Sequence, residues 1–138
     1  MLKRKSLKTM TGVYVAVEEM GPELKGTLTR RDVRHRVEAQ LRAAGIRLIK
    51  EKEAAKLPGE PYLYVNLAAL PLKGKTFACR IDLEVHQLVA LVHDPKGGHA
   101  ITWEQGMLTV GGMEVITKHL DELVFEFICD YLAMHPGG

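Results

Sequence analysis

Apolar and polar residues alternate along several stretches of the chain, which is typical of β-strands with one buried face. The longest of these stretches is at 76–93. The alternating stretches, together with one short apolar run, predict a sheet of four or five strands. The expected strands are 12–18 (GVYVAVE), 46–49 (IRLI), 62–70 (YLYVNLAAL), 76–93 (TFACRIDLEVHQLVALVH) and 100–105 (AITWEQ).

The alternation stops inside the longest β-rich segment. From Gln87 the chain continues with five apolar residues, 88–92 (LVALV). This indicates a bulge or bend, or a stretch covered on both faces. The following residues, 94–98 (DPKGG), are expected to form the loop of a hairpin. Glycines bracket the short apolar segment 107–110 that comes after the last strand.

Two other stretches repeat their apolar residues every three or four positions, as helices do. Thr29 and Asp32 have the spacing of a capping box and Gly45 follows the last apolar position, so a helix is expected at 29–44. A second helix is expected at 113–134. The order β-α-β-β-β-β-α predicts an α+β two-layer sandwich, with both helices on one face of a mixed, mainly antiparallel sheet.

The 138 residues, of which 46% are apolar, correspond to one globular domain. We expect this domain to span 12–136, and we expect 1–11, which holds four basic residues, to be a disordered tail. A core of this size needs no cofactor in order to fold. No apolar run reaches the roughly 18–20 residues that a membrane-spanning helix needs.

A formal net charge of +2 is too small to steer the chain towards nucleic acid. Arg30, Arg31 and Arg34 lie together on the first expected helix. They would form a nucleic-acid interface only if they joined the basic tail on one surface. The polar face of a solvated helix explains them equally well, so nucleic acid is not an expected partner.

Several strings resemble a family of uncharacterised bacterial proteins that are made with export signals. They are GVYVAVEEM, LRAAGIRLI, PYLYVNL, IDLEVHQLVALV, AITWEQG and DELVFEFICDYLAMHP, which span about residues 12–136. The family has no established activity. The resemblance implies a periplasmic or cell-envelope protein whose signal is absent from this sequence. The N-terminus itself has a basic start without an apolar region behind it, which leaves a cytoplasmic protein as the alternative.

The polar face of the sheet is the first candidate site. Tyr62, Tyr64, Asn66 and Arg80 are expected on the face away from the helices, and Trp103 is placed there as well. Aromatic and basic side chains on an open sheet favour binding of a partner. The leading hypothesis is therefore a non-catalytic binding or assembly module of the cell envelope. It would use the open face or an edge strand to contact a protein, lipid or glycan.

Asp82, Glu84 and His86 alternate on the same face and provide the second hypothesis, a small enzyme or a metal-binding protein. Successive side chains on one strand face lie about 6.6–7 Å apart. Metal ligands must approach within about 2.0–2.6 Å of the ion. One strand cannot supply all three ligands, so we expect neither a metal site nor catalytic residues here.

Other candidates have weaker support. His93 and His99 flank the expected hairpin loop and would meet across it. Cys79 and Cys129 lie on apolar faces, and whether they pair is not fixed by their positions in the sequence. A long uncovered edge strand would favour self-association, so a homo-oligomer, with a dimer as the default, is an expectation.

Overall fold

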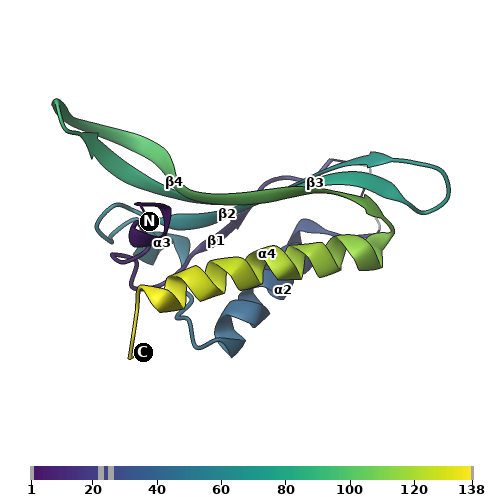
Figure 1. The fold of residues 1–138 in the computed structure, drawn as a ribbon, viewed down its shortest axis with the longest axis horizontal. Coiled ribbons are helices and arrows are strands. Elements are labelled where there is room, and N and C mark those ends of the chain that lie inside the picture. Colours follow the sequence, from purple (N-terminus) through teal and green to yellow (C-terminus); the bar gives the residue numbers. More distant parts are fainter. Residues whose placement is uncertain (1, 22–23, 25–26, 138) are drawn as a thin grey trace.

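The computed structural model describes residues 2–21, 24 and 27–137 as a sheet covered on one face by two helices (Figure 1). The α+β two-layer sandwich predicted from the sequence is confirmed. The elements in chain order are α1 (Leu2–Lys5), β1 (Val15–Val17), α2 (Arg30–Ala43), α3 (Glu51–Ala54), β2 (Tyr62–Pro71), β3 (Phe77–Leu91), β4 (Asp94–Gly111) and α4 (Met113–Ala133).

The sheet has four strands in the order β1-β2-β3-β4. Strand β1 runs parallel to β2, whereas β2, β3 and β4 are antiparallel neighbours. The strand expected at 46–49 is reduced to a single parallel bridge between Val13 and Leu48. The segment is too short to extend the pairing before α3 begins at Glu51.

Alternating apolar residues of the strands form the core against α2 and α4. Leu63 and Val65 of β2 pair with Val85 and Leu83 of β3, and all four side chains are buried. The intervening residues face away from the helices and are only partly buried. The alternation in the sequence therefore predicts the two faces of β2 and β3 correctly.

Helix α2 begins as its sequence predicts. The Thr29 hydroxyl accepts a hydrogen bond from the Asp32 backbone N–H at 3.0 Å, and the Asp32 carboxylate accepts one from the Thr29 N–H. This reciprocal pair satisfies two backbone donors at the start of the helix. It orients α2 so that Val33, Val37 and Leu41 enter the core.

The hairpin between β3 and β4 differs from the expectation. Residues 94–98 are part of β4, and the turn is made by Val92 and His93. Strand β4 then continues without a break to Gly111. Two glycines of β4 allow β3 to come close. A Cβ on Gly97 would collide with the carbonyl of Val89, and a Cβ on Gly106 would collide with Asp82.

The N-terminal segment also differs from the expected disordered tail. Leu7 and Met10 are completely buried in the core. The Tyr131 hydroxyl donates to the Met10 carbonyl at 3.0 Å, and the Gln87 side chain donates to the Ser6 carbonyl at 3.0 Å. The two apolar side chains anchor the segment, because burying each of them is favourable by about 1.5–3 kcal/mol.

Candidate functional site

The open face of the sheet brings together most of the residues that the sequence singled out. Across β2 and β3, Tyr62 pairs with His86, Tyr64 with Glu84, and Asn66 with Asp82. Arg80 follows on the same face, opposite Ala68. Seven of the eight candidate side chains thus lie on one surface, as expected.

Three of these side chains form an aromatic row across the open face. The rings of Tyr62 and His86 are stacked, with centroids 5.0 Å apart, and Tyr64 lies 5.2 Å from His86. His99 of β4 extends the row, with its ring 6.4 Å from Tyr62. The sequence placed His99 opposite His93 instead. In the structure His93 is in the turn, whereas His99 pairs with Leu88 of β3.

Asp82 is engaged apart from Glu84 and His86, which contact each other. The Asp82 carboxylate pairs with Arg80 at 3.0 Å, and His86 Nε2 lies 2.9 Å from Glu84 Oε1. The other ring nitrogen of His86 lies 3.3 Å from the Tyr62 hydroxyl. Within the described part of the chain, no three His, Cys, Asp or Glu side chains are grouped so as to hold one metal ion. Among the described residues these three side chains therefore form no common metal site, and only Glu84 and His86 of the three are in contact.

A tyrosine–carboxylate contact joins β2 to the end of β1. The Tyr64 hydroxyl donates a hydrogen bond to the Glu18 carboxylate. This bond, together with one from the Glu19 N–H, lowers the pKa of Glu18 below its ordinary value. Burial, aided by the Glu18 carboxylate, raises the pKa of Tyr64 to about 12. The pair is thus held with Glu18 charged and Tyr64 neutral at ordinary pH.

This contact lies in a groove of about 440 Å³ that follows the edge of the sheet formed by β1. Side chains from β1, β2, β4, α2, α3 and the loop before β2 line it together. The lining residues are Tyr14, Ala16, Val17, Glu18, Arg30, Glu51, Ala54, Ala55, Glu60, Tyr62, Tyr64 and His99. Tyr62 and Tyr64 among them were predicted residues of the open face, and Arg30 and His99 were candidates for other sites. The parallel pairing of β1 with β2 brings Glu18 beside Tyr64.

Trp103 does not lie on the open face; this expectation was wrong. The side chain is only 1% exposed and packs edge-on against Phe127 of α4, with centroids 5.3 Å apart. A register shift between Val85 and His86 places Trp103 opposite Val85, whose side chain points into the core. A bulge of this kind changes which residues of a strand face the core.

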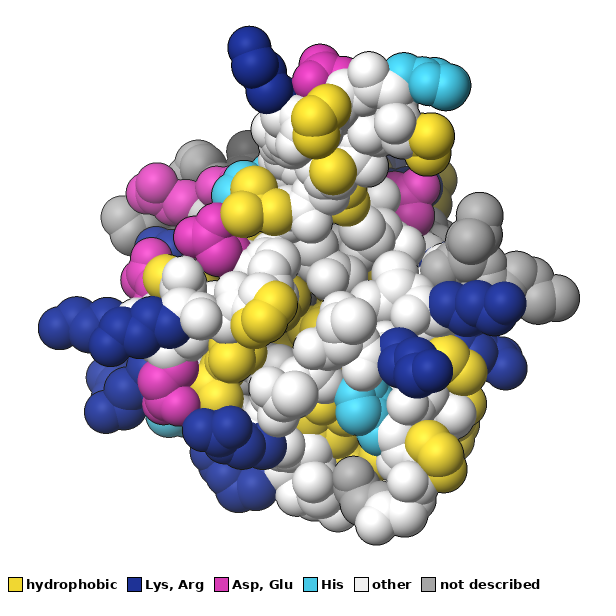
Figure 2. Space-filling view, turned by 90° about the vertical axis from the view of Figure 1, so that its left-hand side faces the viewer, with side chains coloured by type: hydrophobic (Ala, Val, Ile, Leu, Met, Phe, Trp, Pro, Cys, Tyr) yellow, Lys and Arg dark blue, Asp and Glu magenta, His cyan; other side chains and the backbone are white. Residues whose placement is uncertain are grey.

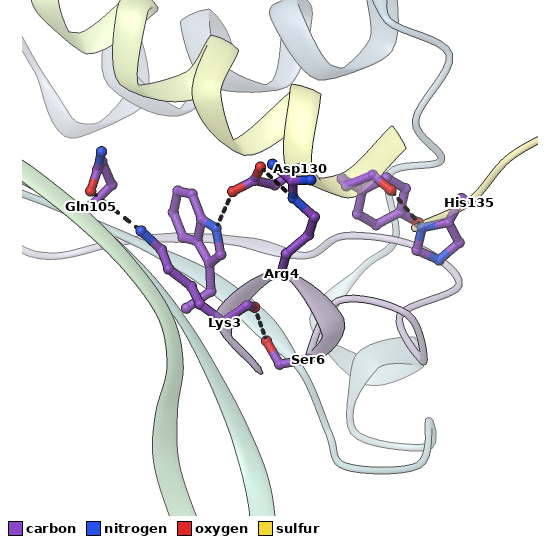
Figure 3. Close-up of polar contacts among 8 residues, drawn as sticks. Lys3, Arg4, Ser6, Gln105, Asp130 and His135 are labelled. Carbon is purple, nitrogen blue, oxygen red and sulfur yellow. Dashed lines mark hydrogen bonds and ion pairs between the residues drawn. The ribbon is translucent and has the colours of Figure 1, made fainter. Parts of the chain in front are cut away.

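The basic N-terminal residues contact the core side of the sheet near Trp103 (Figure 3). The Lys3 ammonium lies 4.9 Å from the centre of the Trp103 ring, and it donates to Gln105 at 3.3 Å. Arg4 pairs with Asp130 of α4 at 3.1 Å. These contacts orient α1 along β4 and α4.

The three arginines considered for nucleic acid are placed elsewhere. Arg30 Nε donates to the Val17 carbonyl at 2.7 Å. Arg30, Arg31 and Arg34 line a shallow hollow together with His35. No described contact joins this group to Lys3 or Arg4, which are engaged at Trp103 and Asp130. The structure therefore adds nothing in favour of a nucleic-acid interface.

The ends of β3 and β4 project beyond the helical layer as a two-stranded arm, residues 88–101 (Figures 1 and 2). It carries exposed apolar side chains: Leu91 is 67% exposed and Val92 is 95% exposed, with Leu88 and Ile101 further back. Figure 2 shows hydrophobic side chains along the arm at the top of the view. Of the two alternatives for the lost alternation at 88–92, the bulge is confirmed by a register shift between Val89 and Leu91. Coverage on both faces is not found, because Leu88, Leu91 and Val92 are exposed.

A second apolar surface lies on the open face at the opposite end of the sheet. Leu70 of β2 and Val110 of β4 flank Ala78 of β3, and Leu108 lies beside Arg80 in the next row. Leu70, Leu108 and Val110 are each between 61% and 69% exposed. We refer to these three residues as the far patch.

Both cysteines are free: Cys79 is buried and Cys129 is exposed. Burial raises the pKa of the Cys79 thiol to about 11, so this thiol stays protonated and unreactive at neutral pH. Of the helices described, none has both the length and the apolar character needed to cross a membrane.

Comparison with known proteins yields similarity at the level of fold. No family model and no curated protein matches the chain. One similar solved structure is a PelC variant from Paraburkholderia phytofirmans, described as a dodecamer. It is 12% identical, with a TM-score of 0.55 and 89% of each chain covered. Another is a minor lipoprotein from Acinetobacter baumannii, 12% identical, with a TM-score of 0.25 and coverage of 91% of this chain and 95% of that one. The likeness to PelC shows a shared fold alone.

Proposed function

We propose that the protein is a non-catalytic assembly module, and that its arm associates with a second copy of the same chain. The observation that carries this proposal is the apolar character of the arm. The most exposed large apolar side chains of β3 and the turn are Leu91 and Val92, at the tip of the arm.

An isolated two-stranded ribbon is only marginally stable in water, and an apolar one is a liability for aggregation. Full burial of each large apolar side chain contributes about 1.5–3 kcal/mol. Covering Leu88, Leu91, Val92 and Ile101 would therefore stabilise both the arm and the complex. Strand β4 is also the edge of the sheet, so its outer backbone groups can pair with another strand.

A second copy offers a matching surface. The far patch is apolar and exposed, and it lies at the other end of the same sheet. From Ala78 to Leu91 along β3 the separation is about 43 Å at the usual rise of a strand. One molecule cannot bring its own two surfaces together over this distance. A single arm-to-patch contact between copies is heterologous and builds rings or filaments, whereas a reciprocal pair related by a two-fold axis ends at a dimer.

The similarity of fold to a PelC variant described as a dodecamer supports the proposal in one respect. It indicates that a sheet-and-helix sandwich of this kind is compatible with an assembly of many copies. The location of this protein in the cell envelope, which the sequence resemblance implies, is part of the same proposal. Immunoblotting of periplasmic, membrane and cytoplasmic fractions tests that location.

The alternative function, a small enzyme or metal-binding protein using Asp82, Glu84 and His86, is not favoured by the geometry. Asp82 pairs with Arg80, and Glu84 contacts His86, so the three groups do not converge on one point. A partner-binding role needs no such convergence.

Sedimentation velocity over a range of concentrations tests the assembly. We expect the mass of the full chain to rise above the 15.4 kDa of one copy as concentration increases. Leu91→Asp should keep the protein monomeric with an unchanged far-ultraviolet spectrum, because the side chain is exposed in the monomer. A monomeric wild-type protein at every concentration, or assembly unaffected by Leu91→Asp, would contradict the proposal.

A further inference from the structure

We propose that the groove along β1 binds a small organic cation, such as a quaternary or alkyl ammonium group. His99, at the base of the arm, lines this groove, but the exposed apolar side chains of the arm and the far patch do not, and the site does not depend on self-assembly. Three features of the groove support it: its aromatic and apolar lining, its balance of charge, and the fixed positions of its side chains.

The lining combines aromatic rings with small apolar residues. Two of the rings, Tyr62 and Tyr64, are in β2, and the third, Tyr14, directly precedes β1. The small side chains of Ala16 and Ala54 leave the space between the rings open. The faces of aromatic rings attract cations, and several rings around one pocket are the usual way in which proteins recognise ammonium groups. The groove, at about 440 Å³, is large enough for such a ligand.

The charge of the groove is negative. Glu18, Glu51 and Glu60 line it with one guanidinium, that of Arg30. Arg30 is already engaged, because its Nε donates to the Val17 carbonyl. Among the described residues, neither Glu51 nor Glu60 takes part in an ion pair. An incoming cation would find two carboxylates that no described basic side chain neutralises.

Several of these side chains are held in place before any ligand arrives. Tyr64 is oriented by its hydrogen bond to Glu18, and Tyr62 by stacking on His86. Glu60 has a φ of +43°, a left-handed conformation that favours glycine. This backbone is therefore strained, and the strain is maintained at a position whose side chain lines the groove.

A cation fits this environment better than a sugar or an anion. Any ligand that covers the groove removes water from Glu51 and Glu60, and a positive charge compensates both carboxylates by direct attraction. A neutral saccharide would compensate the carboxylates only through hydroxyl hydrogen bonds and would leave the net negative charge of the groove in place. A phosphate or a nucleic-acid backbone would be repelled.

Titration of the ¹⁵N-labelled full chain with choline tests the proposal, and 3,3-dimethylbutan-1-ol is the neutral control of the same shape. Sodium chloride at matched concentration controls for ionic strength. We expect choline to shift the amide signals of Ala16, Glu60 and His99 with a dissociation constant of about 1 mM. The neutral alcohol should bind at least about tenfold more weakly.

Three variants locate the site. Glu60→Gln removes one charge and Tyr62→Leu removes one ring, and each should weaken choline binding by about three- to tenfold. Glu122→Gln, on the exposed side of α4, should bind as the wild type does. Equal binding of the neutral alcohol, tighter binding of methyl glucoside, or no shift up to about 50 mM choline would each overturn the proposal.

Discussion

The indole Nε1 of Trp103 donates a hydrogen bond to the Asp130 carboxylate at 2.9 Å. The same carboxylate accepts a hydrogen bond from Arg4 Nε at 3.1 Å. This carboxylate therefore connects three parts of the chain that are far apart in the sequence: β4, α4 and α1. The N-terminal segment is joined to the core at this point, and again by the burial of Leu7 and Met10.

Replacing Asp130 should separate the two roles of its carboxylate. Asp130→Ala leaves the indole N–H of Trp103 buried without its acceptor, and should lower the free energy of unfolding by about 1–3 kcal/mol. Asp130→Asn keeps an oxygen acceptor and loses only the pairing with the exposed Arg4, which is worth less than about 1 kcal/mol. Urea denaturation measures both. Equal losses in the two variants would show that the indole hydrogen bond contributes little.

The N-terminal segment should contribute to stability as a part of the core. Leu7→Ala removes a completely buried side chain and should lower the free energy of unfolding by about 2–5 kcal/mol. The neighbouring Lys8→Ala changes an exposed position and should alter stability by less than about 0.5 kcal/mol. If both variants unfolded at the wild-type urea concentration, the segment would be dispensable, as a disordered tail would be.

The long strands β2 and β3 and the two long helices could be predicted because local patterns determine them. Alternation predicts the faces of β2 and β3, and the Thr29 capping box predicts where α2 begins. The position of Trp103 could not be predicted, because it depends on a register shift between two strands. The glycines at 97 and 98 suggested a turn, whereas Gly97 in fact allows a close approach to Val89.

The candidate site was only partly predictable for the same reason. Tyr62, Tyr64 and His86 share a face by alternation within β2 and β3. Glu18 and Glu60 join them through the parallel pairing of β1 and through a left-handed backbone position, neither of which has a local sequence signal. The basic residues of the first eleven positions predicted a disordered tail, whereas the structure buries Leu7 and Met10 in the core.

The contact between Tyr64 and Glu18 predicts a measurable dependence on pH. The pKa of Glu18 is below its ordinary 4.5 in the folded protein. A carboxyl group with a lowered folded pKa contributes stability above its unfolded pKa, and this contribution is lost as pH falls through the folded value. Tyr64→Phe removes the main donor, so the pKa of Glu18 should rise towards 4.5. Carboxyl ¹³C titration measures this; an unchanged pKa would mean that Tyr64 is not responsible.

The two cysteines should differ sharply in reactivity. Cys129 is exposed and should react with a thiol reagent at pH 8 in the native protein, whereas buried Cys79 should react only after unfolding. The folded pKa of Cys79, about 11, exceeds its ordinary 9.0. The raised pKa of Cys79 therefore does not change the stability of the folded state below pH 9, and it lowers this stability as pH rises from 9 towards 11. Reaction of both thiols in the native protein at equal rates would contradict the buried position of Cys79.

An assembly that joins arm to far patch makes a prediction that a symmetric arm-to-arm dimer does not. Leu91→Asp damages the arm and keeps the patch, whereas Leu108→Asp damages the patch and keeps the arm. Each variant alone should be monomeric, because every contact needs one intact surface of each kind. In an equimolar mixture, the intact arm of Leu108→Asp should bind the intact far patch of Leu91→Asp. This heterodimer should grow no further, since its two unused surfaces each carry a substitution. Light scattering after size-exclusion chromatography measures the masses.

The control for this experiment is Phe125→Asp on α4, which is as exposed as the far patch but belongs to neither surface, so the variant should assemble like the wild type. A symmetric arm-to-arm contact would give a different pattern. Leu108→Asp would then dimerise by itself, and mixing it with Leu91→Asp would add no new species. The mixing result distinguishes arm-to-patch from arm-to-arm contacts, and the mass of the wild-type assembly then shows whether arm-to-patch contacts extend to a ring or filament or end at two copies.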